Sequence, residues 1–211
     1  MMCSTSDKDS RRSVKQRWSR ILRRLARSQD GSAAIEFAIL SVPYFIIIFA
    51  IVETFVAFTA EQLITNAVNN LGRQLRTGEI TYNLGRTTDM TATQFRQAFC
   101  DEVSIIIKCS AGEVSTPSKL YIDARTFTSF AAIPTTIPRK STAAFADIDP
   151  TSFKFTPGGP DTINMLRAYY RWQVITDLVR PYITNIRPDD GSMPSDFLIV
   201  ATTTFKNENY P

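Results

Sequence analysis

The chain has 211 residues, no histidine and a formal net charge of +4. The lack of histidine excludes imidazole-based acid–base catalysis, histidine metal ligands and nucleophiles paired with histidine. The sequence also contains no glycine-rich phosphate loop and no regular series of acidic residues of the kind that binds calcium. We therefore expect no enzyme, no catalytic residue, no cofactor and no metal site.

Residues 1–31 form a basic segment with nine Lys or Arg against three Asp. Such a segment directly before an apolar run is typical of the cytoplasmic flank of a membrane helix. Apolar residues recur at helical spacing over 11–27, and two interpretations stay open: an amphipathic helix on the anionic cytoplasmic leaflet, or a solvated positive leader. A nucleic-acid-binding arm is less favoured, and we expect no nucleic-acid partner.

Residues 33–60 form an apolar run in which only Glu36 and Glu53 are charged. A membrane-spanning helix needs about 20 mostly apolar residues, so the run predicts a span over about 33–58. Pro43 removes one backbone hydrogen bond, which Ser41 or neighbouring helices can compensate. Glu53 is expected to be solvated near the outer membrane surface, with a role in helix packing as the alternative.

The helical pattern continues beyond the apolar run as an amphipathic extension over 61–77. Its apolar stripe consists of Ile64, Ala67, Val68, Leu71 and Leu75. Gly78 is well placed to end the helix. We therefore expect one helix over 32–78, with its first half in the membrane and its second half packed on a domain formed by residues 79–211.

This domain is predicted to contain one short helix and three strands. Thr91 and Gln94 form a capping box ahead of an apolar helix face. Alternation with period two predicts strands near 120–124, 166–174 and 197–205. Residues 133–160 are rich in Pro and Thr and predict an irregular excursion, with room for a short strand at 153–155.

The expected fold class is α+β: a long N-terminal transmembrane helix that continues into a small extracytoplasmic domain with a short helix and an antiparallel sheet. In the second strand, Arg167 and Arg171 alternate with Tyr170 and Trp172. Because the aromatic rings and the arginines then face opposite ways, the pattern predicts a half-buried strand rather than a stacking surface for nucleic acid.

Cys100 and Cys109 lie in the predicted domain, and an oxidising compartment would allow them to form a disulfide. If one helix contained both, their Cα atoms would be about 13 Å apart, whereas a disulfide needs less than about 7 Å. A bond therefore requires the helix to end near 104–107 and the chain to fold back. Two buried free thiols are the alternative.

The most informative stretch is the junction Gly31-Ser32-Ala33-Ala34-Ile35-Glu36-Phe37. An ordinary signal peptidase cuts after the apolar segment, where residues 56–61 offer a poor small-residue pattern. Gly31 instead gives a peptidase access to the backbone before the helix, and cleavage there would create an amine on Ser32. A carboxylate at the edge of an apolar helix calls for a partner, which this amine would supply to Glu36. Solvation of Glu36 by lipid headgroups is the alternative.

This junction, with an aromatic residue after the glutamate, resembles class III (type IV) prepilin leaders of the Tad/Flp pilus system. The string from Gly31 to Pro43 is similar to the start of TadE-like pseudopilins. Further similarity lies in residues 72–78, in the spacing of Cys100 and Cys109, and in residues 120–123 and 204–208. The family's terminal motif has proline directly after the glutamate, whereas Asn209 and Tyr210 come first here.

The resemblance implies a pseudopilin or minor pilin needed for assembly of a Tad/Flp type IV pilus used in adherence or secretion. Its processing site would comprise Gly31, Ser32, Glu36 and Phe37. Its partners would be a prepilin peptidase, other pilins or pseudopilins, the pilus assembly machinery and inner-membrane lipid. It would lie in the bacterial inner membrane as a single-pass protein with a cytoplasmic N-terminus and a periplasmic domain, and its association with the pilus itself stays open. The alternative is an uncleaved envelope protein with an extracytoplasmic binding domain.

Overall fold

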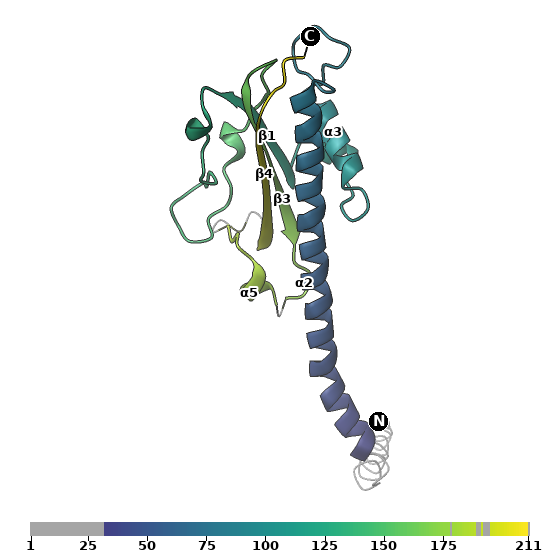
Figure 1. Cartoon of the computed structure of the whole chain (residues 1–211). Coiled ribbons are helices and arrows are strands. Elements are labelled where there is room, and N and C mark those ends of the chain that lie inside the picture. Colours follow the sequence, from purple (N-terminus) through teal and green to yellow (C-terminus); the bar gives the residue numbers. More distant parts are fainter. Residues whose placement is uncertain (1–31, 178, 189–190, 192–194, 211) are drawn as a thin grey trace, which may run out of the picture. The chain divides into compact units, whose positions relative to one another are not determined.

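The computed structural model describes residues 32–177, 179–188, 191 and 195–210. The basic leader, including Gly31, lies outside the described residues. The chain divides after Phe49 into two compact units. Helix α2, Ser32–Thr77, contributes to both units and confirms the long helix expected from the sequence (Figure 1).

In the second unit, α2 packs by the apolar stripe expected from the sequence. Each residue of that stripe is almost fully buried: Ile64, Ala67, Val68, Leu71 and Leu75. The helix ends at Gly78, whose φ of +79° is the left-handed conformation that terminates many helices.

Two short helices follow α2 along the chain. Helix α3, Ala92–Glu102, begins with the predicted capping box of Thr91 and Gln94. Its buried face, which is the apolar face expected after the capping box, includes Phe95 and Phe99. Helix α4, Ala111–Ser115, was not expected from the sequence and is capped by Ser110.

The sheet has the strand order β2-β1-β3-β4. Strands β1 (Leu120–Phe127), β3 (Ile163–Gln173) and β4 (Asp196–Lys206) are antiparallel neighbours. Strand β2, Phe155–Thr156, pairs with β1 in parallel. The α+β class is confirmed, but the sheet is mixed, because the excursion after β1 returns beside β1 in the same direction.

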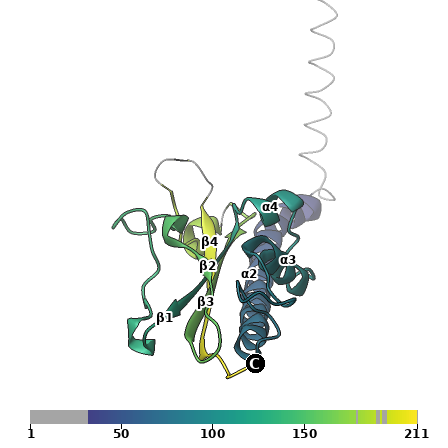
Figure 2. The same ribbon diagram turned by 90° about the horizontal axis from the view of Figure 1, so that it is seen from above.

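Helices α2 and α3 cover one face of the sheet, and the excursion after β1 covers the other (Figure 2). The short 3-10 helix η2, Phe130–Ala132, directly precedes the excursion, and a second one, η3, Pro150–Ser152, lies within it. A second, smaller apolar cluster lies beneath it, formed by Ile148, Tyr169, Ile186 and Leu198. Strand β3 is therefore buried on both faces, and the prediction of a half-buried strand is wrong.

Burial of β3 places its two arginines inside the domain. Arg171 is only 2% exposed and forms an ion pair with Asp147 of the excursion. The Arg167 guanidinium donates to the Thr202 hydroxyl and to the carbonyl oxygen of Pro134. Buried charges need partners of this kind, and these contacts fasten the excursion to the sheet.

Candidate functional site

The predicted processing junction leads into the first turns of α2. Gly31 lies outside the described residues, and Ser32 is the first residue of the helix. Glu36 is exposed four residues later, and Phe37 beside it is 72% exposed. Residues four apart share one face of a helix, and helical side chains tilt toward the N-terminus. Glu36 therefore occupies the helix face that contains Ser32 and leans toward the end of the helix.

The helix that follows exposes large apolar side chains on all sides. They are Ile35, Phe37, Ile39, Leu40, Val42, Tyr44, Phe45, Ile47, Ile48, Phe49, Ile51 and Val52. A helix that is apolar all round needs a hydrocarbon environment or partner helices, since water would oppose such exposure. Within the part of the chain that the structure describes, one helix, inside Ala33–Thr77, is long and apolar enough to cross a membrane.

The helix continues through a proline, and a nearby serine forms a hydrogen bond to the backbone. Pro43 lies inside α2 without ending it. Ser41 donates from its hydroxyl to the Ala38 carbonyl oxygen, at 3.0 Å. The carbonyl that loses its usual donor to Pro43 belongs to Ile39, four residues earlier. Ser41 therefore binds a neighbouring carbonyl rather than replacing the hydrogen bond that proline removes.

Glu53 is bound to the domain, so the expectation that it is merely solvated is wrong. Its carboxylate accepts hydrogen bonds from the backbone N–H groups of Ile175 and Thr176, the latter at 3.0 Å. Ala57, one turn later, is already buried. The predicted membrane span over 33–58 therefore extends into a part of α2 that packs against the domain. The sequence gives no signal for this contact, because its partners lie more than 120 residues away.

Residues 31–73 match a family model described as TadE-like protein. The chain is TadE-like over this segment. The match includes the junction and the exposed apolar helix, and it agrees with the resemblance noted in the sequence. A search of curated proteins and a search of solved structures gave no match.

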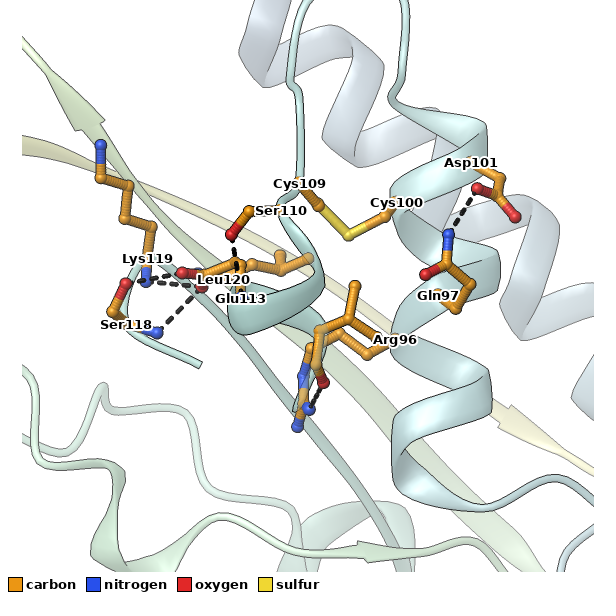
Figure 3. Close-up of a disulfide and its surroundings, with 11 residues drawn as sticks. Arg96, Gln97, Cys100, Asp101, Cys109, Ser110, Glu113, Ser118, Lys119 and Leu120 are labelled. Carbon is orange, nitrogen blue, oxygen red and sulfur yellow. Dashed lines mark hydrogen bonds between the residues drawn. A yellow bond between two sulfur atoms is a disulfide. The ribbon is translucent and has the colours of Figure 1, made fainter. Parts of the chain in front are cut away.

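Beyond the TadE-like segment, the structure places Cys100 and Cys109 as a disulfide (Figure 3). Their Sγ atoms are 1.98 Å apart and their Cα atoms 5.9 Å apart. Helix α3 ends at Glu102, slightly before the range 104–107 expected from the sequence, and the chain turns back before α4, which brings the two cysteines together. Ile107 is buried after this turn, whereas Ile106 is only partly buried.

A carboxylate next to the disulfide organises the start of the sheet (Figure 3). Glu113 Oε1 accepts hydrogen bonds from the backbone N–H groups of Ser118, Lys119 and Leu120, at 2.9, 2.7 and 2.7 Å. Partial burial raises the pKa of Glu113, but these bonds and one from the Ser118 hydroxyl outweigh it, so the pKa lies below its ordinary value. Glu113 thereby fixes the chain between α4 and β1.

The C-terminal residues contact the end of α2 despite their departure from the family's terminal motif. The Tyr210 ring packs over Gly78, and the Arg86 guanidinium lies 5.3 Å from the ring centroid. Asn207 Nδ2 donates to the Tyr210 hydroxyl at 3.0 Å, and Glu208 N–H donates to the Arg76 carbonyl at 2.9 Å. The insertion of two residues before the terminal proline is therefore compatible with a C-terminal contact.

The described residues contain no group of three or more His, Cys, Asp or Glu side chains placed to hold a metal ion. Burial raises the pKa of Asp196, although the nearby Arg171 opposes this shift. The exposed apolar surface of the first half of α2, with Glu36 on it, is the candidate functional site within the described residues.

Proposed function

We propose that this protein is a pseudopilin, or minor pilin, needed for assembly of a Tad/Flp type IV pilus. The observation that carries the proposal is the TadE-like match, which begins at Gly31 and continues along the exposed apolar helix. The role proposed is structural: the protein supplies a membrane helix and an extracytoplasmic domain to an assembly of other pilins.

In this proposal, residues 1–31 stay in the cytoplasm, residues 33–52 span the inner membrane and the domain lies in the periplasm. The span is set shorter than 33–58 because Glu53 already contacts the domain. Twenty residues at about 1.5 Å each are long enough for the hydrocarbon core of about 30 Å. The basic leader gives the cytoplasmic orientation by the positive-inside rule.

A prepilin peptidase would cut after Gly31 and leave an amine on Ser32. Glu36 is then the carboxylate placed to bind this amine, in the same chain or in a neighbouring subunit. In the apolar surroundings of the bilayer an unpaired carboxylate is costly, so pairing favours a docked position over a free one. The pair would set the register in which the mature helix packs on other pilin helices.

A complementation experiment tests this role of Glu36. In a host that lacks the native copy, we expect Glu36→Gln to be processed normally but to lose most surface pili, because the neutral amide cannot neutralise the new amine. Glu61→Gln, which changes a carboxylate of α2 beyond the span, is the matched control and should restore pili. Normal piliation by Glu36→Gln would contradict the proposed pairing.

A second candidate function is an uncleaved, single-pass envelope protein whose periplasmic domain binds a partner. The long helix and the disulfide-containing domain are compatible with it. It differs in one respect that can be measured: the leader would remain on the mature protein.

A further inference from the structure

The domain carries an exposed apolar surface beside the point where α2 enters it. Ile175 and Tyr182 are 82% and 87% exposed, and they belong to the segment between β3 and β4 that includes α5, Arg180–Ile183. This segment lies at the end of the sheet where β3 finishes and β4 begins (Figure 1). Both side chains belong to this one segment, and exposed apolar surfaces of this kind mark sites of contact with a protein or a membrane.

The position of this surface along α2 is fixed by hydrogen bonds. Glu53 binds the backbone N–H groups of Ile175 and Thr176. The Arg180 guanidinium in turn donates to the Val174 carbonyl oxygen, at 2.9 Å from Nη2. These hydrogen bonds link the start of the segment after β3 both to α5 and to Glu53 of α2. Glu53 is the first charged residue after the uncharged stretch 37–52.

An apolar hollow adjoins the same surface. It has a volume of about 210 Å³ and is lined by Thr54, Ala57, Phe58, Ile183 and Phe197. Ala57 and Phe58 lie four and five residues beyond Glu53, which places them about 6–8 Å further along the helix axis. The polar headgroup layer of a bilayer leaflet is about 5–8 Å thick. The helix residues of the hollow, Thr54 to Phe58, lie about 3–9 Å beyond residue 52, so the hollow extends through this layer to its outer edge when residues 33–52 fill the hydrocarbon core.

We propose that the surface formed by Ile175, Tyr182 and this hollow rests on the outer leaflet of the membrane, with both side chains inserted into the lipid headgroup region. A lipid surface is favoured over a protein partner because the exposed apolar residues Ile51 and Val52, the last of the proposed span, directly precede Glu53, to which this surface is attached. Tyrosine is typical of this depth. The exposed Asp177 is neutralised by Arg180, whose Nη2 lies 2.8 Å from its carboxylate, so no bare carboxylate from it opposes insertion.

The inference rests on the membrane span of the proposed function but not on cleavage or pilus assembly. It is tested with the full chain in lipid nanodiscs that hold one copy each, in a Cys3→Ser background. Single cysteines are introduced by Ile175→Cys and Tyr182→Cys and labelled with an environment-sensitive fluorophore. Phe45→Cys reports on the span, and Phe130→Cys, an exposed residue in η2, is the matched control.

We expect nitroxide-bearing lipids to quench the labels at 175, 182 and 45 several-fold more strongly than the label at 130, and aqueous iodide to show the reverse order. Labels at 175 and 182 that behave like the label at 130, while the label at 45 is quenched by lipid, would overturn this inference alone. An unquenched label at 45 would overturn the span and with it this inference. Shielding of 175 and 182 only in discs with two copies would assign the surface to a second subunit instead.

Discussion

At the scale of single residues, both the backbone conformation and the surroundings of position 78 favour glycine. Its φ is +79°, and a Cβ atom there would lie 2.6 Å from Cγ of Tyr210. We expect Gly78→Ala to lower the free energy of unfolding by at least about 2 kcal/mol, since backbone strain and the collision with the ring add together. Chemical denaturation of the detergent-solubilised protein measures this change.

Gly85 provides the control for the effect of backbone strain. It also has a left-handed φ, +72°, but no atom lies within 4 Å of the position that a Cβ would occupy there. Gly85→Ala should therefore cost only about 1 kcal/mol. Equal losses in the two variants would show that the Tyr210 contact does not form.

Because the pKa of Glu113 is lowered in the folded protein, we expect the free energy of unfolding to depend on pH. The stabilising effect of this carboxylate is fully present above the ordinary pKa of the group, near 4.5, and is lost as the pH falls through the lower folded value. Glu113→Gln should therefore reduce the melting temperature at pH 7, by an amount equivalent to about 1 kcal/mol given its partial exposure.

Thermal unfolding between pH 2.5 and 7 tests this expectation, because the difference between wild type and Glu113→Gln should shrink as the pH falls below about 4. A difference that stays constant over the whole range would contradict a role for the ionised carboxylate.

At the scale of elements, the contact between α2 and the loop after β3 depends on Glu53. We expect Glu53→Ala to increase amide hydrogen exchange at Ile175 and Thr176 by about 10-fold to 100-fold, because these N–H groups lose a charged acceptor. Glu61→Ala is the matched control on the same helix and should leave this loop unchanged. Unchanged exchange in Glu53→Ala would contradict the contact.

The connection between α3 and α4 gives a second prediction at this scale. If Cys100 and Cys109 are bonded in the mature protein, alkylation without reductant will leave both unmodified, and reduction will make both reactive. Closure of a loop with a sequence separation of 9 contributes about 2–3 kcal/mol, so a Cys100→Ser, Cys109→Ser variant should be less stable by that amount. Two labelled thiols in the unreduced protein would contradict the disulfide.

The elements with strong local signals were predictable from the sequence. Helix α2 followed from its long apolar run and from the stripe that ends at Leu75, and α3 followed from the capping box at Thr91. The resemblance of the junction to TadE-like sequences rests on Gly31 and Glu36 at the start of an apolar helix, and the family match over 31–73 agrees with it, while cleavage there stays a prediction. These signals lie within a few residues of one another, which is the range over which helix periodicity and capping operate.

The features that the sequence did not predict depend on contacts between distant residues. The burial of Arg171 requires Asp147, 24 residues away, and the position of Glu53 requires the loop after β3. The parallel pairing of β2 depends on the path of the excursion rather than on its own two residues. Alternation in β3 indicated its two faces correctly but could not show that both faces would be covered.

At the scale of the whole molecule, a TadE-like helix with an apolar surface leads into an α+β domain that is held to it by Glu53 and by the C-terminal residues. This arrangement fits a subunit whose helix packs with others in the membrane while its domain stays outside. Such a role requires no catalysis by the chain itself. Removal of the leader is the step that separates this role from that of an uncleaved envelope protein.

The most direct test is the N-terminal sequence and intact mass of the protein extracted from membranes of its native host, with and without the prepilin peptidase. We expect an N-terminus at Ser32 that depends on the peptidase, is abolished by Gly31→Ala and is retained by the matched control Ser32→Ala. A chain that keeps residues 1–31 in the presence of the peptidase would contradict the pseudopilin account and favour an uncleaved envelope protein.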